Sequence, residues 1–292
     1  MDGSGAAILF RHAGGDPKNI HWTPAGHLGE VLAEAAVTKN PNIPILIVDV
    51  APESEDVAAF LHDRGNFKVI DHHGSAAQFH GRPGYEVPLN NDACGTELFR
   101  RWLVASGMGL FADKPFERLA LMIDDHDRWV LQKPMSIQMP RFFAFTGQQE
   151  FIERFMDVRV RFAEEKDYYW NEFEKQMLQL IERAQARRFS KLMDKFIVKP
   201  VKFGAKEIKI AYIISAEVNC SELLNEYLKL HPEVDLSCQI NIDLNKVSLR
   251  SIDRADITEF VKPWNGGGHK NAGGHGLPDG LNDFIIRSLH GA

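Results

Sequence analysis

The sequence predicts an α/β fold with two domains: an N-terminal domain on a parallel sheet and a smaller C-terminal α/β domain with a mixed sheet. The length of 292 residues suits two domains of ordinary size. The first hundred residues alternate apolar runs with helical patterns, which is typical of a parallel α/β sheet. The last third has a strand, a helix and a strand hairpin. The N-terminal domain should therefore come first in the chain and the mixed sheet last.

The N-terminal elements follow one another in a regular order. We expect a helix from residue 2 to 11, helices at 29–37 and 53–61, and buried strands at 42–49 and 67–71. Each strand ends in an aspartate, Asp49 or Asp71. Ligands bind beyond the carboxyl ends of parallel strands, so these two carboxylates predict a site. The alternative for a single such aspartate is a cap of the next helix or turn.

Helical patterns dominate after Gly95, and strand patterns return near the end. The expected elements are helices at 96–105 and 116–123, one long amphipathic helix or a pair of helices at 150–184, a strand at 208–214, a helix at 221–230, and strands at 237–244 and 246–251. These elements predict a first domain at 1–147, a helical connector at 148–196 and a second domain at 197–292.

Composition excludes several classes of protein. Lys and Arg number 34 against 40 Asp and Glu, a net charge of −6, so nothing global indicates nucleic acid or membrane. No apolar run approaches the roughly 20 residues of a membrane span. The three cysteines form no C-x-x-C pair. We expect a cytoplasmic protein without a membrane or disulfide partner. Residues 191–209 hold six lysines against Asp194 and Glu207, either a nucleic-acid-facing edge or a solvated face.

Two local patterns carry chemistry. The first is Asp71-His72-His73 at a strand end, because imidazole and carboxylate together suit Mn²⁺, Zn²⁺ or Co²⁺. Adjacent side chains on an extended chain point in opposite directions, so at least one of the three must support the ligands or face a substrate. The second is the stretch 266–274, where five glycines surround His269. Such glycines present N–H groups to a phosphate, unless they form a mobile loop.

These two patterns, in this order, resemble the DHH phosphoesterase superfamily, which joins a DHH domain to a C-terminal DHHA1 domain with a G-G-G-H motif. The resemblance covers the whole chain and is greatest to the branch of oligoribonucleases, cyclic-dinucleotide phosphodiesterases and nucleotide phosphatases. It implies that a water activated by two metal ions hydrolyses short oligonucleotides or related nucleotides. Mn²⁺ is the implied cofactor, with Mg²⁺ or Co²⁺ as alternatives.

The resemblance also implies roles for N-terminal residues. The metal ligands would be Asp2, Asp49, His72 and Asp125, with Asp124 or Asp127 as alternatives to Asp125. Asp71 would orient a ligand histidine, and His73 would face the phosphate as a donor or proton carrier.

In the C-terminal domain the resemblance implies a substrate-binding group. Arg250 and Ser251 would contact phosphate and ribose, and His269 with the amides of Gly267 and Gly268 would hold a terminal phosphate. A planar guanidinium such as that of Arg250 suits a phosphate.

The first family motif, H-x-D-x-D-G, is matched only at its end, by Asp2-Gly3. Its histidine and first aspartate, and the strand before them, have no counterpart. We expect either a start at an internal methionine of a longer protein, which we favour, or a degenerate site, and in both cases impaired activity of this chain. The alternatives are a pyrophosphatase or exopolyphosphatase, and a silent nucleotide-binding protein. A homodimer is left open.

Overall fold

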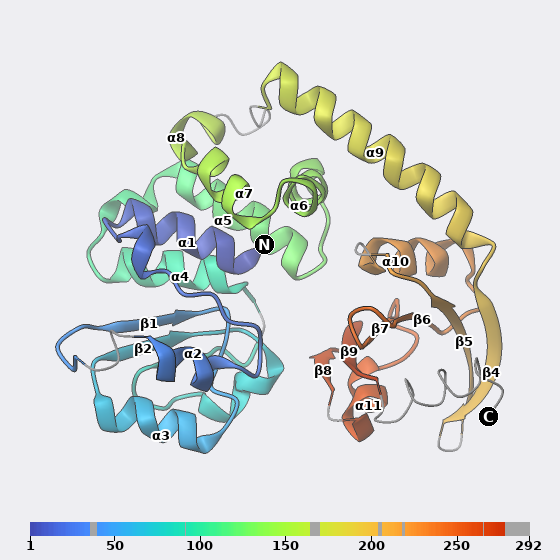
Figure 1. Ribbon diagram of the computed structural model, residues 1–292, viewed down its shortest axis with the longest axis horizontal. Helices are drawn as coiled ribbons and strands as arrows, with labels where there is room; N and C mark the ends of the chain where they lie inside the picture. Colours follow the sequence, from blue (N-terminus) through green and yellow to red (C-terminus); the bar gives the residue numbers. More distant parts are fainter. Residues whose placement is uncertain are drawn as a thin grey trace. The chain divides into compact units, whose positions relative to one another are not determined.

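The computed structural model describes residues 1–35, 40–90, 92–163, 170–203, 206–217, 220–264 and 266–277. The chain divides into two compact units, Met1–Arg183 and Ala184–Ala292 (Figure 1). The first contains a three-stranded parallel sheet and the second a six-stranded mixed sheet. The predicted α/β fold class is therefore confirmed, whereas the domain limits at 147 and 196 stay predictions.

The parallel sheet of the first unit aligns the two predicted strand ends. Its strands are β1 (Ile45–Val48), β2 (Phe67–Ile70) and β3 (Tyr85–Glu86), in the order β1-β2-β3. Val48 lies opposite Ile70 in the register, so the residues that follow, Asp49 and Asp71, leave the sheet at the same edge. The predicted strands at 42–49 and 67–71 thus exist with slightly shorter bounds.

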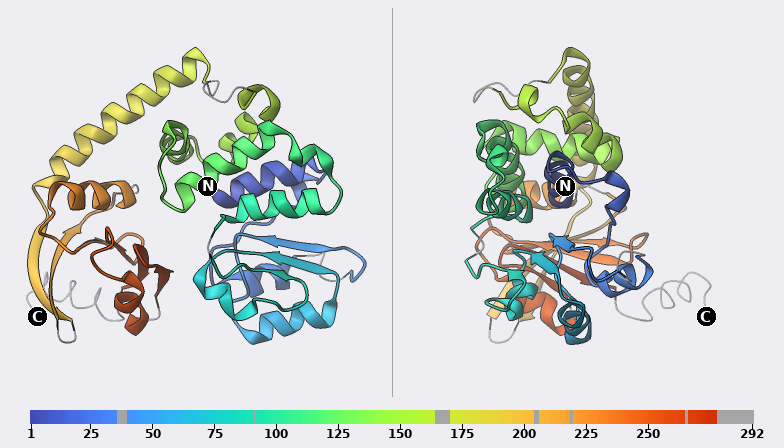
Figure 2. Two further views of the ribbon diagram at one scale, coloured as in Figure 1. Left: turned by 180° about the vertical axis from the view of Figure 1, so that it is seen from behind. Right: turned by 90° about the vertical axis from the view of Figure 1, so that its left-hand side faces the viewer.

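Helices cover both faces of this sheet (Figures 1 and 2). One face carries α2 (Leu28–Glu34) and α3 (Glu55–Arg64); the other carries a helical layer of α1 (Asp2–His12), α4 (Gly95–Ala105), α5 (Lys114–Asp127), α6 (Pro134–Thr146), α7 (Gln148–Phe155) and α8 (Val158–Arg161). Successive residues of a strand point to opposite faces of the sheet. Ile47 therefore packs with α2 and α3, and Val48 packs against the helical layer.

The expected helix or helix pair at 150–184 is three separate helices. After α7 and α8 comes α9 (Glu172–Met193), and residues 164–169 lie outside the described part. The start of α9 is fixed by a reciprocal pair of hydrogen bonds. The amide of Glu174 donates to Asn171 Oδ1 at 2.9 Å, and the amide of Asn171 donates to Glu174 Oε2 at 3.0 Å. This capping box satisfies two amides that a helix start leaves open.

The second unit is a sheet in the order β4-β5-β6-β7-β9-β8. Its elements are β4 (Ile197–Phe203), β5 (Lys206–Ile214), α10 (Cys220–Leu230), β6 (Leu236–Asn241), β7 (Lys246–Arg250), α11 (Ile257–Val261), β8 (Gly267–His269) and β9 (Ala272–Gly276). Tyr227 and Leu228 of α10 pack with Ala211 of β5. Ile257 and Val261 of α11 pack in another cluster with Leu249 of β7. Each helix thus has its own apolar cluster.

The glycine-rich motif forms a hairpin, β8 and β9, and not a mobile loop, which was the alternative interpretation. A Cβ on Gly273 would lie 2.7 Å from Ile257 Cγ2 of α11, and one on Gly274 would lie 2.6 Å from the Val247 carbonyl oxygen of β7. Neither distance accommodates a carbon atom, so these two glycines let the hairpin pack tightly against its neighbours.

In the described part of the chain, no helix is both long and apolar enough to cross a bilayer. The cysteines Cys94, Cys220 and Cys238 are all free thiols.

Candidate functional site

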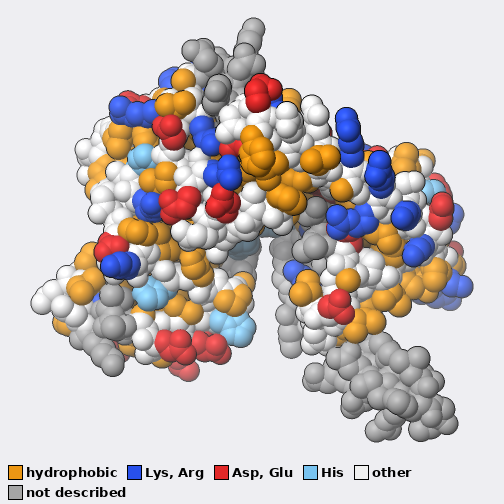
Figure 3. Space-filling model, turned by 45° about the horizontal axis from the view of Figure 1, so that its top comes forward, with side chains coloured by type: hydrophobic (Ala, Val, Ile, Leu, Met, Phe, Trp, Pro, Cys, Tyr) orange, Lys and Arg blue, Asp and Glu red, His pale blue; other side chains and the backbone are white. Residues whose placement is uncertain are grey.

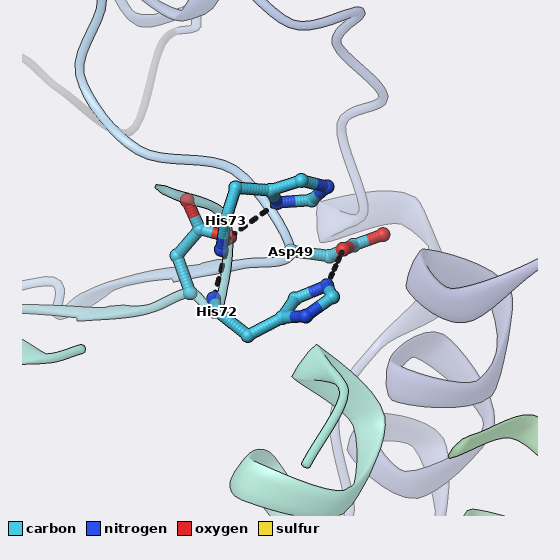
Figure 4. Close-up of side chains that lie close together, drawn as sticks. Asp49, His72 and His73 are labelled. Atoms are coloured by element: carbon cyan, nitrogen blue, oxygen red, sulfur yellow. Dashed lines mark hydrogen bonds and ion pairs between the residues drawn. The ribbon is translucent and has the colours of Figure 1, made fainter. Parts of the chain in front are cut away.

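Three carboxylates converge on one imidazole at the edge of the parallel sheet. Nε2 of His72 lies 3.7 Å from Asp2 Oδ2, 3.5 Å from Asp49 Oδ1 and 3.4 Å from Asp127 Oδ2. Figure 4 shows the ring of His72 facing Asp49. The four side chains come from the start of α1, the ends of β1 and β2, and the last residue of α5. We call them the metal-site cluster.

Asp2 is held in place by the N-terminus of α4. Its carboxylate accepts hydrogen bonds from the amides of Gly95 at 2.7 Å and Thr96 at 2.8 Å. These amides have no partner inside the helix, and the helix dipole favours a negative charge there. A Cβ on Gly95 would lie 3.0 Å from Asp49 Cβ and 3.1 Å from Asp2 Oδ2. Glycine at this position therefore lets α4 approach both carboxylates.

Asp49 sits in an uncommon backbone conformation at the end of β1. Its φ is +68°, in the left-handed region that residues with a side chain rarely adopt. The amide of Gly3 donates to Asp49 Oδ2 at 3.0 Å. Such conformations cost free energy and concentrate at functional sites. Here the turn places the Asp49 carboxylate beside His72.

Asp71 contacts both histidines of the triplet, and its role in orienting a ligand histidine stays a prediction. Asp71 is buried, and its Oδ1 lies 2.7 Å from His73 Nδ1 and accepts the amide of His72 at 2.8 Å. The side chain of His73 is 42% exposed. Its hydrogen bond with Asp71 raises the pKa of His73. The pair therefore presents an accessible imidazole that holds a proton readily.

The cluster contains more acids than bases. Burial by itself lowers the pKa of His72, but the hydrogen bond with Asp49 and the charges of Asp127 and Asp2 raise it to about 10. Partial burial, with the negative charge of Asp2, raises the pKa of Asp49 to about 7 and that of Asp127 to about 6. Burial by itself raises the pKa of Asp2, but hydrogen bonds from Thr96 and the charge of His72 hold it below its usual value. The negative charge of Asp2 disfavours ionisation of Asp49 and Asp127, so a cation would stabilise all three carboxylates.

Asp127, and not Asp125, belongs to the cluster. Asp125 Oδ2 accepts the Ser136 hydroxyl at 2.5 Å and the Lys133 amide at 3.1 Å, which ties the end of α5 to the start of α6. Asp124 binds Arg128 and the amide of Cys94. Both are buried among these partners. Asp127, one of the two alternatives, thus lies where Asp125 was expected, and its role as a metal ligand stays a prediction.

The donor set fits a divalent ion. Asp2, His72 and Asp127 offer ligand atoms within 4.8 Å of one another, and so do Asp49, Asp71, His72 and His73. Carboxylate oxygen with imidazole nitrogen suits Mn²⁺, Fe²⁺, Co²⁺ or Zn²⁺. The described residues therefore support a metal centre that uses Asp2, Asp49, His72 and Asp127.

In the second unit, Arg250 and His269 share a face of the sheet. Both pair with Ala272 of β9 in the register, so their side chains project from the same side two strands apart. The guanidinium of Arg250 donates to the Leu249 carbonyl oxygen at 2.7 Å and to the hydroxyl of Ser221. No carboxylate among the described residues forms an ion pair with Arg250. An anion from outside the protein would complement it.

Gly267 and Gly268 differ in their surroundings. A Cβ on Gly267 would meet nothing within 4 Å, whereas one on Gly268, whose φ is +148°, would lie 2.3 Å from the Ala272 carbonyl oxygen. Gly267 therefore borders open space beside His269, and Gly268 is required by the hairpin itself.

Ser251, an expected substrate contact, is used inside the protein. Its hydroxyl donates to the Asp235 carbonyl oxygen at 3.2 Å and accepts the amides of Arg254 and Ala255. Ser251 is buried and fixes the turn after β7. Ser221, which the sequence analysis missed, is the hydroxyl that contacts Arg250. The feature of the sequence that could have identified Ser221 is its position at the start of a predicted helix.

Known proteins resemble this chain in sequence and in fold. No protein-family profile matches the chain. It is 23% identical to oligoribonuclease NrnB of Bacillus subtilis, over 98% of this chain and 73% of that protein. Its fold is similar to the DHH domain of a member of the s1p family of ribosomal proteins, with a TM-score of 0.60, 12% identity, and 98% and 83% of the two chains covered. It is also similar to RecJ of Thermus thermophilus, solved with Mn²⁺, with a TM-score of 0.51, 20% identity, and 98% of this chain but 49% of that chain covered.

Proposed function

We propose that this chain, which belongs to the DHH/DHHA1 phosphoesterase superfamily, is a metal-dependent hydrolase of short oligonucleotides or related nucleotides. The observation that carries the proposal is the convergence of Asp2, Asp49 and Asp127 on His72 Nε2. The oligoribonuclease similar to this chain supports the substrate class. The cluster offers the carboxylates and imidazole that a phosphoesterase metal site needs.

Asp2, Asp49, His72 and Asp127 would hold a divalent ion. Bound there, the ion would neutralise charge on a phosphate and lower the pKa of a coordinated water. The two groups of convergent ligand atoms have His72 in common. Asp49 Oδ1 lies 3.5 Å from His72 Nε2, and Asp49 is the carboxylate that we propose two ions would share, as the family resemblance implies. We propose Mn²⁺ as the cofactor because the similar RecJ was solved with it.

His73 would move a proton during hydrolysis. Asp71 holds its Nδ1 at 2.7 Å, which leaves Nε2 as the ring nitrogen that can donate to a phosphate or leaving oxygen. The hydrogen bond with Asp71 favours the protonated ring, as a donor requires. Asp71 is the positioning residue and His73 the proton carrier.

The second unit would bind the substrate. Arg250, which forms no ion pair among the described residues, and His269 on the same face would contact a phosphate. A Cβ on Gly267 would meet nothing within 4 Å, and we propose that the amide of Gly267 contacts the same phosphate. Ser221 would orient the guanidinium of Arg250.

The decisive experiment compares substrates under identical conditions. The protein is incubated with a dinucleotide or with pyrophosphate in the presence of Mn²⁺, Mg²⁺ or Co²⁺, with His72→Ala as the control. Release of mononucleotides by the wild type but not by the control supports the proposal. Faster release of phosphate from pyrophosphate would favour a pyrophosphatase. Nucleotide binding without hydrolysis in any metal would favour a silent nucleotide-binding protein.

The glycine hairpin offers a test of substrate binding. Gly267→Ala adds a methyl group that touches nothing within the described protein, so stability should be unchanged. If its amide contacts a phosphate, the methyl group obstructs the substrate and KM rises by about tenfold, which corresponds to about 1.4 kcal/mol. Gly268→Ala is the matched comparison, because it should lower stability as well.

A cytoplasmic location is a further part of the proposal. The free thiols Cys94, Cys220 and Cys238 are in keeping with a reducing compartment. Cell fractionation tests it.

A further inference from the structure

Two arginines of α9, Arg183 and Arg187, are distinguished from the other arginines of the described chain. No hydrogen bond or ion pair joins either of them to a described residue. Every other described arginine binds a carboxylate, a hydroxyl or a carbonyl oxygen: Arg11, Arg64, Arg82, Arg100, Arg101, Arg118, Arg128, Arg141, Arg154, Arg159, Arg161, Arg188, Arg250 and Arg254. The two exceptions lie one turn apart on the same helix.

These arginines belong to a regular row of cations. Arg183, Arg187 and Lys191 are spaced four residues apart on α9, and Lys195 follows its end at the same interval. All four are exposed. Four residues advance a helix by about 6 Å and keep the side chains on one face. Neither lysine forms an ion pair within the described residues. We call this row the α9 ridge.

Other charged residues of α9 do form ion pairs. Lys175 lies 2.8 Å from Glu172, Glu182 lies 3.5 Å from Arg141, and Arg188 lies 3.3 Å from Glu217. Only the ridge face lacks acidic partners among the described residues. The whole chain has a net charge of −6, whereas the ridge is positively charged. Figure 3 shows Lys and Arg side chains gathered on the right of that view.

We propose that the α9 ridge binds the phosphate backbone of a single-stranded oligonucleotide longer than a dinucleotide. Guanidinium groups without internal partners are available for phosphates, and their planar fork matches phosphate oxygens. A row, unlike a single pocket, follows a repeating backbone. The inference deepens the proposed function, on which it rests for the class of substrate. In this proposal the α9 ridge sets the length of oligonucleotide that the protein binds, and the metal-site cluster hydrolyses it.

The test is the salt dependence of RNA binding. The triple variant Arg183→Gln, Arg187→Gln, Lys191→Gln is compared with the wild type by fluorescence anisotropy, with a labelled single-stranded RNA of about ten nucleotides, in EDTA. Each phosphate contact on a single strand contributes about 0.7 to the slope of log K against log salt, so the slope should fall by about 2. If the triple variant fails to fold, Arg187→Gln alone should lower the slope by about 0.7.

Lys175→Gln is the matched control. It removes a charge from the same helix, but that charge is paired with Glu172. Position 175 lies twelve residues from position 187, about 18 Å along the helix. This exceeds the screening length of about 8 Å at physiological salt. The control should therefore keep the wild-type slope.

The outcomes separate this inference from the proposed function. Turnover of a dinucleotide by the wild type with an unchanged slope in the triple variant overturns the inference and leaves the function. A reduced slope in a protein that hydrolyses nothing supports the ridge and overturns the function. Equal RNA affinity of wild type and triple variant, with loss only of binding to anionic phospholipid vesicles, also overturns the ridge as an RNA site.

Discussion

The acids of the metal-site cluster and the structural acids of the same unit have opposite surroundings. Each structural acid is buried with donors of its own: Glu97 with Arg100 and Arg101, Asp124 with Arg128, Asp125 with Ser136, and Glu174 with Arg161. Asp2 also has amide donors, from Gly95 and Thr96, but Asp2, Asp49 and Asp127 face one another across a single histidine, and no described lysine or arginine forms an ion pair with them.

The pKa values follow this difference. Burial alone raises the pKa of Glu174, but hydrogen bonds from Arg161 and Asn171 hold it below its usual value. Burial and the neighbouring Asp2 raise the pKa of Asp49 to about 7. Buried carboxylates without a cationic partner lower stability, so stability alone does not account for their presence in the cluster. Three acids of this unit that lack a described lysine or arginine partner thus lie together in the candidate functional site.

The largest effect is expected at Asp127. Asp127→Ala removes one carboxylate of the metal-site cluster and should lower Mn²⁺ affinity by more than about 100-fold, since changes to mere supporting residues cost about 10- to 100-fold. Isothermal titration of metal-free protein measures this. Folding should be little changed, because the Asp127 side chain is 31% exposed. Wild-type affinity in this variant would remove Asp127 from the site.

Asp125→Asn should lower the stability of the fold and not the affinity for metal. It weakens the bonds from the Ser136 hydroxyl and the amides of Gln132 and Lys133, so the free energy of unfolding should fall by about 2 kcal/mol. Urea denaturation measures the change, with Ser136→Ala as the matched control for one bond. A loss of Mn²⁺ affinity larger than that of Asp127→Ala would restore Asp125 as the ligand.

Glu174→Gln should lower the free energy of unfolding by about 1–2 kcal/mol at pH 7. The folded pKa lies below the unfolded value of about 4.3, so the stabilisation is present above that pH and is lost as pH falls through the folded pKa. Denaturation of wild type and variant at several pH values should show the difference shrinking below about pH 4. A difference that is constant down to pH 3 would contradict the role of the carboxylate charge.

The smallest effect, with the opposite sign, is expected at Asp49. Its folded pKa of about 7 lies above the usual value of 3.8, so the ionised carboxylate destabilises the metal-free protein above pH 7, and this cost disappears as pH falls. Asp49→Asn should therefore raise the melting temperature in EDTA at pH 8 by about 2–4 °C. Asn also tolerates the left-handed backbone.

The advantage of Asp49→Asn should diminish towards pH 5. A variant less stable than the wild type at pH 8 would mean that the contact between Asp49 and His72 outweighs the repulsion among the acids. Mn²⁺ titration of the same variant provides the functional counterpart, because loss of a cluster carboxylate should weaken binding while stability rises.

The fold and half of the candidate site follow from local patterns. Strands ending in Asp49 and Asp71 could be predicted because buried apolar runs and terminal acids are readable without tertiary information. Parallel pairing then brings both ends to one edge. For the glycine motif the sequence left a mobile loop open as the alternative to a phosphate-binding backbone. Contacts with α11 and β7, which make a larger residue too big, decide that it is a hairpin.

The choice among Asp124, Asp125 and Asp127 could not be made from spacing. Successive residues on a helix point about 100° apart, so neighbouring acids face different surroundings. Only the placement of Arg128, Ser136 and His72 around the end of α5 decides which carboxylate is tied up and which is available.

The sequence by itself determined the class of fold, the strand-end acids, the D-H-H triplet and the glycine motif, because these depend on residue type and local period. The tertiary structure decided the directions of the side chains. It turned Asp71 towards His73, tied Ser251 into a turn, and left Arg183 and Arg187 without partners among the described residues. The physical reason is that a charge acquires its role from the donors and acids that folding brings within a few ångströms of it.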